Sequence, residues 1–216
     1  MKLTYNCDFG DKNEDIYICI NGNEKTLSVG ESVNVCCCNK KNITIYTKKT
    51  KDINSLRMAV LFMKRLILNF FNIIIMNPPN KWYQNVEPFS LLPQAIKFEG
   101  DIELIYVPTQ IDKSTMRITK PQLMVNNQSI SFKIELDIKA INLAFITYVF
   151  DLISLLLYAC VPITLMFLFS GMMDVPLVIL SYLIILLVIV VPVILKIAKT
   201  NKEKKKFISK SASLCL

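Results

Sequence analysis

The sequence lacks histidine altogether, and only five of its 216 residues are glycine. Without histidine the chain can supply neither a Ser-His-Asp triad nor a Cys-His pair, and an HExxH zinc site is equally excluded. The few glycines do not match the spacing of the phosphate-binding loops GxxxxGK[ST] and GxGxxG. These absences remove several common catalytic and nucleotide-binding sites, and we expect a protein that is not an enzyme and has no cofactor.

Hydrophobic residues are abundant instead, at 53% of the chain with a mean hydropathy of +0.42. Such hydropathy favours a membrane protein over a soluble or disordered one. The formal net charge of +8 divides unevenly, because residues 1–140 carry +4, residues 141–195 carry −2 and residues 196–216 carry +6. The sequence therefore predicts a mixed-polarity domain at 1–140, a transmembrane hairpin at 141–197 and a basic tail at 198–216.

The hydrophobic part is predicted to form two transmembrane helices, from about Asn142 to Phe169 and from about Val175 to Ile197. Each is long enough for a span, which needs about 20 apolar residues to cross the hydrocarbon. The connector between them is very short, so the two spans should form an antiparallel hairpin. Asp151 is the charge that lies well inside the first span. It is interpreted either as an intramembrane group that handles protons or ions, or as a paired residue near the helix end.

The placement of lysines predicts the orientation in the membrane. Seven lysines follow the second span, and cytoplasmic flanks are enriched in Lys and Arg. The N-terminus lacks the apolar core of a signal peptide, so we expect an integral, two-span protein with both termini in the cytoplasm. Anionic lipids are the expected partner of the tail, and nucleic acid is not, because the tail shares its charge with the membrane surface. The tail lysines expected at the membrane interface are Lys196, Lys199, Lys204, Lys205 and Lys206.

The region before the spans is predicted to be rich in β-structure. Ile16, Ile18 and Ile20 alternate with other residues, and Asn21-Gly22 indicates a hairpin turn. Residues 1–50 hold four or five such short patterns, which is typical of a small β-sandwich or barrel. The clearest pattern is period two over residues 130–139, which predicts one long strand leading into the first span. The predicted fold class is an α+β membrane protein with a cytoplasmic, β-sandwich-like domain.

Residues 53–76 form a predicted amphipathic helix inside this domain. At 100° per residue its polar side chains fall in an arc of roughly 140°, and most of the remaining wheel is apolar. Three interpretations stay open: a core helix packed on the sheets, a helix in the membrane interface, or a third span. Lys64 and Arg65 near the middle argue against spanning. The candidate membrane-interface residues here are Arg57, Lys64, Arg65, Lys81, Trp82 and Tyr83.

Seven cysteines raise the question of metal or redox chemistry. In a strand, Cys36 and Cys38 would point to the same face, where two thiolates form a weak candidate metal site. We favour the simpler interpretation that these cysteines are small buried hydrophobic residues, and we predict no metal.

Taken together, the sequence favours a membrane-anchored, non-catalytic binding or accessory subunit that holds its β-domain at the cytoplasmic face of a membrane. Such a subunit would have a protein partner or form a homo-oligomer. The alternative is a small subunit of an oligomeric transporter or channel-like assembly in which the hairpin is the working part. A cysteine-based enzyme is a third, weaker hypothesis.

Overall fold

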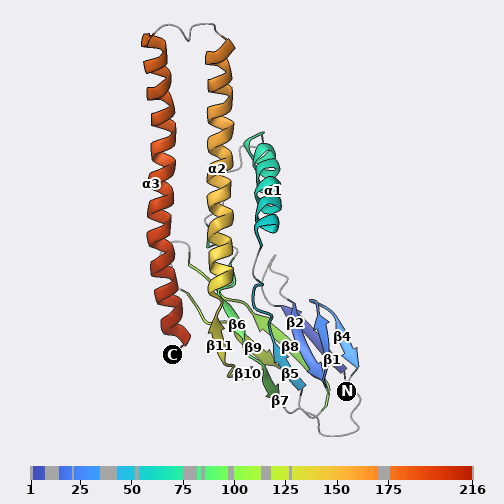
Figure 1. The fold of residues 1–216 in the computed structure, drawn as a ribbon. Coiled ribbons are helices and arrows are strands. Elements are labelled where there is room, and N and C mark those ends of the chain that lie inside the picture. Colours follow the sequence, from blue (N-terminus) through green and yellow to red (C-terminus); the bar gives the residue numbers. More distant parts are fainter. Residues whose placement is uncertain are drawn as a thin grey trace. The chain divides into compact units, whose positions relative to one another are not determined.

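The computed structural model describes residues 2–7, 15–20, 22–34, 43–51, 54–74, 82–83, 86–96, 100–112, 118–126, 128–169 and 176–215. The chain is an α+β protein in which N-terminal β-sheets with one helix are followed by two long apolar helices (Figure 1). The strands are β1 Lys2–Cys7, β2 Ile16–Ile20, β3 Asn23–Leu27, β4 Ser32–Asn34, β5 Ile43–Tyr46, β6 Phe89–Leu91, β7 Gln94–Ile96, β8 Ile102–Val107, β9 Gln122–Val125, β10 Gln128–Ile130 and β11 Ile134–Leu136. The helices are α1 Ser55–Ile74, α2 Ile138–Phe169 and α3 Pro176–Cys215.

The chain packs into two compact units. Unit 1 comprises Met1–Lys51, Tyr83–Ile141 and Phe207–Leu216, whereas unit 2 comprises Asp52–Trp82 and Asn142–Lys206. All the described strands therefore belong to unit 1, and α1 belongs to unit 2 together with most of α2 and α3. The domain boundaries drawn from the sequence, at 141 and 198, stay a prediction.

Unit 1 contains a five-stranded sheet, a four-stranded sheet and a two-stranded sheet. The five-stranded sheet has the order β10-β9-β8-β1-β4, the four-stranded sheet has the order β3-β2-β5-β7, and β11 pairs with β6. All pairs are antiparallel except β1 with β8, which run parallel with Leu3 opposite Ile102 and Tyr5 opposite Leu104. This parallel pair ties the first strand of the chain to a strand about a hundred residues later.

The sheets of unit 1 share one hydrophobic core. Because successive side chains of a strand point to opposite faces, every second residue enters this core. The five-stranded sheet contributes Leu3, Tyr5, Ile102, Leu104, Tyr106, Leu123 and Val125, and the four-stranded sheet contributes Ile16, Ile18, Leu27, Ile43 and Ile45. Burying each such aliphatic side chain stabilises the fold by about 1.5–3 kcal/mol before entropy costs, so this core holds the two larger sheets together.

The predicted hairpin at Asn21-Gly22 joins β2 to β3. The register places Ile20 opposite Asn23, which leaves two residues in the connection. Gly22 has a φ of +83°, a conformation that is unfavourable for residues with a Cβ atom. Asn21 itself lies outside the described residues.

The single strand predicted over residues 130–139 is wrong. The segment instead contains the last residue of β10, the whole of β11 and the start of α2. β10 pairs with β9, but β11 pairs with β6 in a different sheet, so the chain changes sheets between them. Period-two alternation reports which side chains share a face, and it does not report a change of partner strand or the start of a helix.

Asp137 starts α2 and explains why the strand stops. Its Oδ1 accepts a hydrogen bond from the Ala140 backbone N–H at 3.0 Å, which is the interaction of a helix N-cap. Its Oδ2 accepts a hydrogen bond from the Thr50 backbone N–H at 2.7 Å. The side chain is only 7% exposed, so both hydrogen bonds are shielded from water. One carboxylate therefore caps the helix and fixes the segment after β5.

The two long helices are longer than the sequence predicted. Within the described residues, α2 and α3 are the two helices that are long and apolar enough to cross a membrane, over Ile138–Phe169 and Val178–Cys215. α2 begins four residues before the predicted start at Asn142, because Asp137 caps it. α3 does not end near Ile197 but continues to Cys215, so the described part of the basic tail is helical.

We predict that Asp137→Ala loosens both segments that the carboxylate holds. The loss of an N-cap and of a buried acceptor should cost about 2 kcal/mol. The amides of Thr50 and Ala140 should therefore exchange with deuterium about 30-fold faster, measured by hydrogen exchange in detergent micelles. Asp101→Ala is the matched control, because that exposed carboxylate accepts a hydrogen bond from the Lys2 N–H and its loss should leave both amides unchanged. Unaltered exchange in Asp137→Ala would contradict the capping role.

Candidate functional site at the contact between α1 and α2

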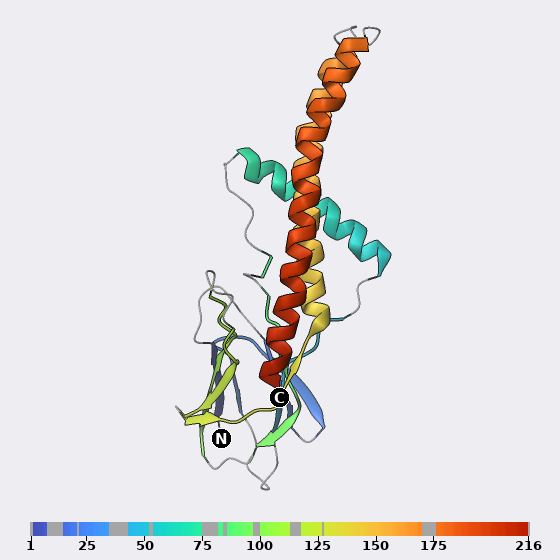
Figure 2. The same ribbon diagram turned by 90° about the vertical axis from the view of Figure 1, so that its left-hand side faces the viewer.

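Unit 2 is built around α2, which is contacted by both other helices. Figure 1 shows α1 and α3 on either side of α2, and Figure 2 shows that α1 runs obliquely to the long helices. The helix α1 begins at a cap formed by Asn54, whose Oδ1 accepts a hydrogen bond from the Arg57 backbone N–H at 3.0 Å. The backbone carbonyl of Asn54 accepts a hydrogen bond from the Met58 N–H at 3.0 Å. Both the side-chain oxygen and the backbone oxygen of Asn54 thus bind the first turn of the helix.

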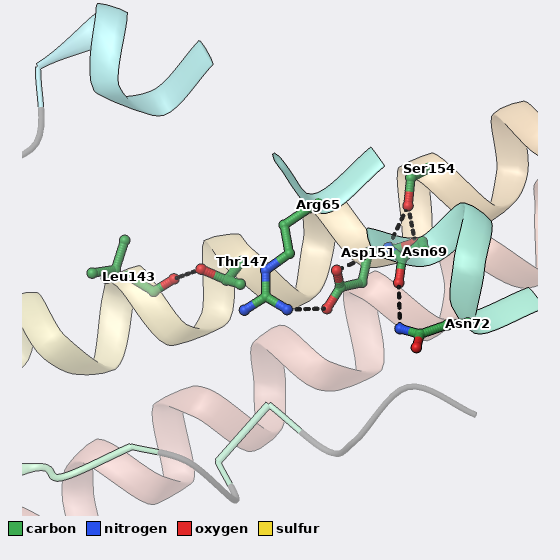
Figure 3. Close-up of polar contacts among 7 residues, drawn as sticks. All are labelled: Arg65, Asn69, Asn72, Leu143, Thr147, Asp151 and Ser154. Atoms are coloured by element: carbon green, nitrogen blue, oxygen red, sulfur yellow. Dashed lines mark hydrogen bonds and ion pairs between the residues drawn. The ribbon is translucent and has the colours of Figure 1, made fainter. Parts of the chain in front are cut away.

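The contact between α1 and α2 centres on Asn69 of α1. Its Nδ2 donates to Asp151 Oδ1 at 2.9 Å and to Ser154 Oγ at 2.6 Å (Figure 3). The Ser154 hydroxyl in turn donates to the Asp151 backbone carbonyl at 2.8 Å. Asn69 is 3% exposed and Ser154 is fully buried. Both protons of the Asn69 amide are thus used on α2, at a place that water does not reach.

Arg65, one helical turn before Asn69, supplies the charge that balances Asp151. Its Nη1 lies 3.8 Å from Asp151 Oδ2, so the guanidinium and the carboxylate form an ion pair (Figure 3). Asn72 adds a weaker hydrogen bond to Asn69 Oδ1 at 3.4 Å. An ionised carboxylate on an apolar helix is unfavourable unless it is paired and hydrogen-bonded. Arg65, Asn69, Asp151 and Ser154 satisfy this requirement together, and we refer to them as the polar cluster.

Aromatic and backbone contacts extend the helix contact on both sides of the polar cluster. Phe62 packs edge-to-face on Phe150 with ring centroids 5.2 Å apart. The Tyr158 hydroxyl donates to the Leu66 backbone carbonyl at 2.7 Å, and the ring of Tyr158 lies 5.8 Å from that of Phe70. Ser154 and Tyr158 thus both make polar contacts with α1.

The register of α2 against α3 follows from two polar contacts. Thr164 Oγ1 and the Tyr182 hydroxyl lie 3.0 Å apart, and Lys204 Nζ donates to Asn142 Oδ1 at 3.2 Å. Moving 22 residues back along α2, from 164 to 142, corresponds to moving 22 residues forward along α3, from 182 to 204. The helices are therefore antiparallel in constant register, and Asp151 lies level with Leu195, immediately before the first lysine of α3.

The remaining residues that the sequence singled out differ in how deeply they are buried. Lys204 is half-buried and lies over the Phe145 ring at 4.4 Å, while Trp82 packs edge-to-face on the same ring within unit 2. Tyr83 is buried within unit 1, stacked on Phe207. The exposed residues are Arg57, Lys64, Lys196, Lys199, Lys205 and Lys206. Lys81, Cys36 and Cys38 lie outside the described residues.

An ion pair at the four-stranded sheet shifts the pKa of neighbouring groups. Lys48 Nζ lies 2.8 Å from Glu24 Oε1 and 4.1 Å from the centre of the Tyr17 ring. The hydrogen bond to Lys48 lowers the pKa of Glu24, and the hydrogen bond to Glu24 raises the pKa of Tyr46 to about 12. Glu24 and Lys48 are exposed, and exposed pairs contribute little stability. The ion pair therefore joins β3 to the segment that follows β5.

The polar cluster links α1 to α2. Both oxygens of Asp151 are engaged, and the Asn69 amide donates both of its protons. Within the described ranges, no group of three or more His, Cys, Asp or Glu side chains could hold a metal ion. The sequence named Arg65 and Asp151 separately, but it did not predict that Asn69 would join them. The available signal was the spacing of Arg65, Asn69 and Asn72, which places all three on one helix face.

Comparison with known proteins leaves the function to be argued from these residues alone. No family model, no curated protein and no solved structure matches this chain. The fold and the polar cluster nevertheless define a class, namely an α+β chain with two helices that could span a membrane and a third helix paired to one of them through buried polar groups.

We predict that Asn69→Ala releases α1 from α2, because two buried hydrogen bonds are lost at once. Interhelical hydrogen bonds in membranes contribute about 0.6–2 kcal/mol each. The amides of residues 58–72 should therefore exchange roughly 10-fold faster in detergent micelles, and Arg65→Ala should produce a smaller increase of about fivefold.

Lys64→Ala is the matched control for Arg65→Ala. Lys64 is the neighbour of Arg65 but is exposed, so its removal should change α1 exchange by less than about twofold. The polar cluster would lose its assigned role if Lys64→Ala and Asn69→Ala accelerated exchange equally. The strands of unit 1 should exchange as in the unaltered protein in every variant.

Proposed function

We propose that the chain is a membrane-anchored, non-catalytic binding or accessory subunit that presents its β-domain at the cytoplasmic face of a membrane. One observation carries this proposal. A single residue, Asp137, separates β11 from α2, and its side chain is fixed on both sides. The last strand of the β-domain is thus one residue away in the chain from a helix that could span a membrane, and this short connection supports a module held at a membrane surface.

The charge-free parts of the two long helices have the length of a bilayer span. From Leu152 to Phe169 α2 carries no charged residue, and from Pro176 to Leu195 α3 carries none. At 1.5 Å per residue these stretches measure about 27 Å and about 30 Å, close to the hydrocarbon thickness of about 30 Å. The antiparallel register ends both stretches at the same level, which supports a two-span hairpin.

The lysines of α3 support the cytoplasmic placement of both termini. They begin directly after the charge-free stretch, where cytoplasmic flanks are enriched in Lys and Arg. Lys196 and Lys199 are exposed next to the end of the apolar stretch, so they are the first candidates for anionic headgroups. Each lysine near such a surface contributes about 1 kcal/mol. Lys204 is engaged with Asn142 and Phe145, and we assign it to helix packing instead.

The alternative is a small subunit of an oligomeric transporter or channel-like assembly. It is supported by a carboxylate on an apolar helix, Asp151, and by Pro162 and Pro192 inside the long helices, since broken or kinked helices occur in transporters. The engagement of both Asp151 oxygens by α1 favours the anchor.

Replacement of residues 152–195 by an unrelated two-span hairpin separates these functions. If the hairpin serves as an anchor, the exchanged protein should still recover the same stoichiometric protein partner from mild detergent as the unaltered chain. Asp151→Asn should likewise leave partner recovery unchanged. Loss of the partner in the exchanged protein would contradict the anchor and favour the transport assembly, and a monomer without a partner in the unaltered chain would contradict the accessory role.

Labelling of single cysteines tests the predicted topology. In a cysteine-free background, a thiol at Asn23 should react with a membrane-impermeant maleimide only after permeabilisation, because β3 should face the cytoplasm. A thiol at Met172, in the connector between the spans, should react in intact cells. Labelling of Asn23→Cys in intact cells would overturn the orientation, and the Met172→Cys reaction is the control for reagent access.

A further inference from the structure

The helix α1 has an unusual distribution of side chains, because its buried polar residues face α2 and most of its large apolar residues face outward. Its contact face carries Arg65 and Asn69, which pair with Asp151. On the opposite face Val60 is 61% exposed and Ile67 is 57% exposed. The large exposed hydrophobic residues of the outer face are Leu56, Val60, Met63, Ile67 and Phe71, while Phe70, at the border of this face, also packs on Tyr158 of α2. In water this arrangement would leave the apolar face uncovered, which is costly and rare for a patch of this kind.

The position of α1 along α2 indicates which medium surrounds the outer face of α1. The contacts of α1 on α2 run from Phe150 to Tyr158. Asp151 lies level with Leu195, the last apolar residue before the lysines of α3. Seven residues separate Asp151 from Tyr158, or about 10 Å along the helix. The contact zone therefore begins at the end of the charge-free stretch and reaches about 10 Å into it, which is the depth at which interfacial helices bury their apolar face.

Two basic residues mark one edge of the same outer face. On a helical wheel at 100° per residue, Arg57 and Lys64 lie about 20° apart, next to Phe71 at the border of the apolar arc. Both are exposed. The opposite border of the arc, at Ala59 and Phe70, carries no charge. A helix lying in a membrane interface needs this asymmetry, with a basic edge for headgroups and an apolar face for acyl chains.

We propose that α1 is a third membrane element, which lies in the leaflet on the side of the lysine tail and whose outer face is covered by lipid acyl chains. The proposal rests on the two-span anchor of the proposed function. Lipid is the occupant because α3, at the same level, also exposes apolar side chains that include Val188 and Val191. The polar cluster sets the depth of α1, since it fixes Asn69 against Asp151 and Ser154.

Quenching of a single tryptophan by brominated phosphatidylcholine tests this proposal in vesicles. Trp82 is the one native tryptophan, so Trp82→Phe provides the background. In this background Ile67→Trp reports on the outer face of α1, Leu187→Trp on the middle of the α3 span, and Lys205→Trp on the helix about 15 Å beyond Leu195. We expect Ile67→Trp to lose at least about half as much emission as Leu187→Trp, and Lys205→Trp to be little quenched.

The outcomes distinguish this proposal from the one on which it rests. Strong quenching of Leu187→Trp with none of Ile67→Trp would overturn the lipid contact of α1 and leave the two-span anchor intact. Absence of quenching in Leu187→Trp would overturn the anchor itself. An unquenched Ile67→Trp that forms cross-linked dimers would assign the outer face to a second copy, against the proposal. Val60→Trp repeats the measurement on the same face and guards against a local disturbance at position 67.

Discussion

A carboxylate on an apolar helix has to be paired, and Asp151 imposes that requirement on unit 2. Arg65 supplies the opposite charge and Asn69 supplies a hydrogen bond, so the polar side of α1 has to face α2. The apolar side of α1 then has to face outward. An unpaired charge in hydrocarbon would cost several kcal/mol, which is more than the cost of exposing a few apolar side chains to lipid. Asp151 thus favours the orientation of α1 that the contacts of Phe62 and Phe70 also hold.

Asp137 meets a similar requirement at the start of the same helix. It is buried, and it satisfies two backbone N–H groups that would otherwise lack a partner, one at the start of α2 and one at Thr50. Because an unsatisfied buried donor costs about 1–3 kcal/mol, this carboxylate fixes the point at which strand becomes helix. Asp137 and Asp151 are 14 residues apart on one continuous chain segment. Each carboxylate fixes neighbouring segments by accepting hydrogen bonds from them.

The sequence predicted the features that depend on local periodicity and missed those that depend on tertiary partners. The alternation at Ile16, Ile18 and Ile20 and the helix near 53–76 correspond to β2 and α1, and the two apolar stretches correspond to α2 and α3. The parallel pairing of β1 with β8 could not be predicted, because periodicity does not name a partner strand. The strand expected over 130–139 failed for the same reason, since β11 pairs with β6 and Asp137 favours a helix start over further alternation. For the polar cluster, the wheel placed Arg65 and Asn69 on one face, but only the fold shows that Asp151 lies opposite them.

The polar groups within the charge-free stretches bear on the choice between anchor and transporter. Thr164 donates to the Cys160 carbonyl of its own helix and contacts Tyr182, and Ser181 donates to the Val178 carbonyl. Ser154 and Tyr158 are engaged with α1. A path for ions or polar solutes needs polar groups directed into a water-filled space, whereas each of these groups is satisfied locally or by a neighbouring helix. The same satisfaction of polar groups is what an anchor in lipid requires, so the internal hydrogen bonding of unit 2 favours the anchor.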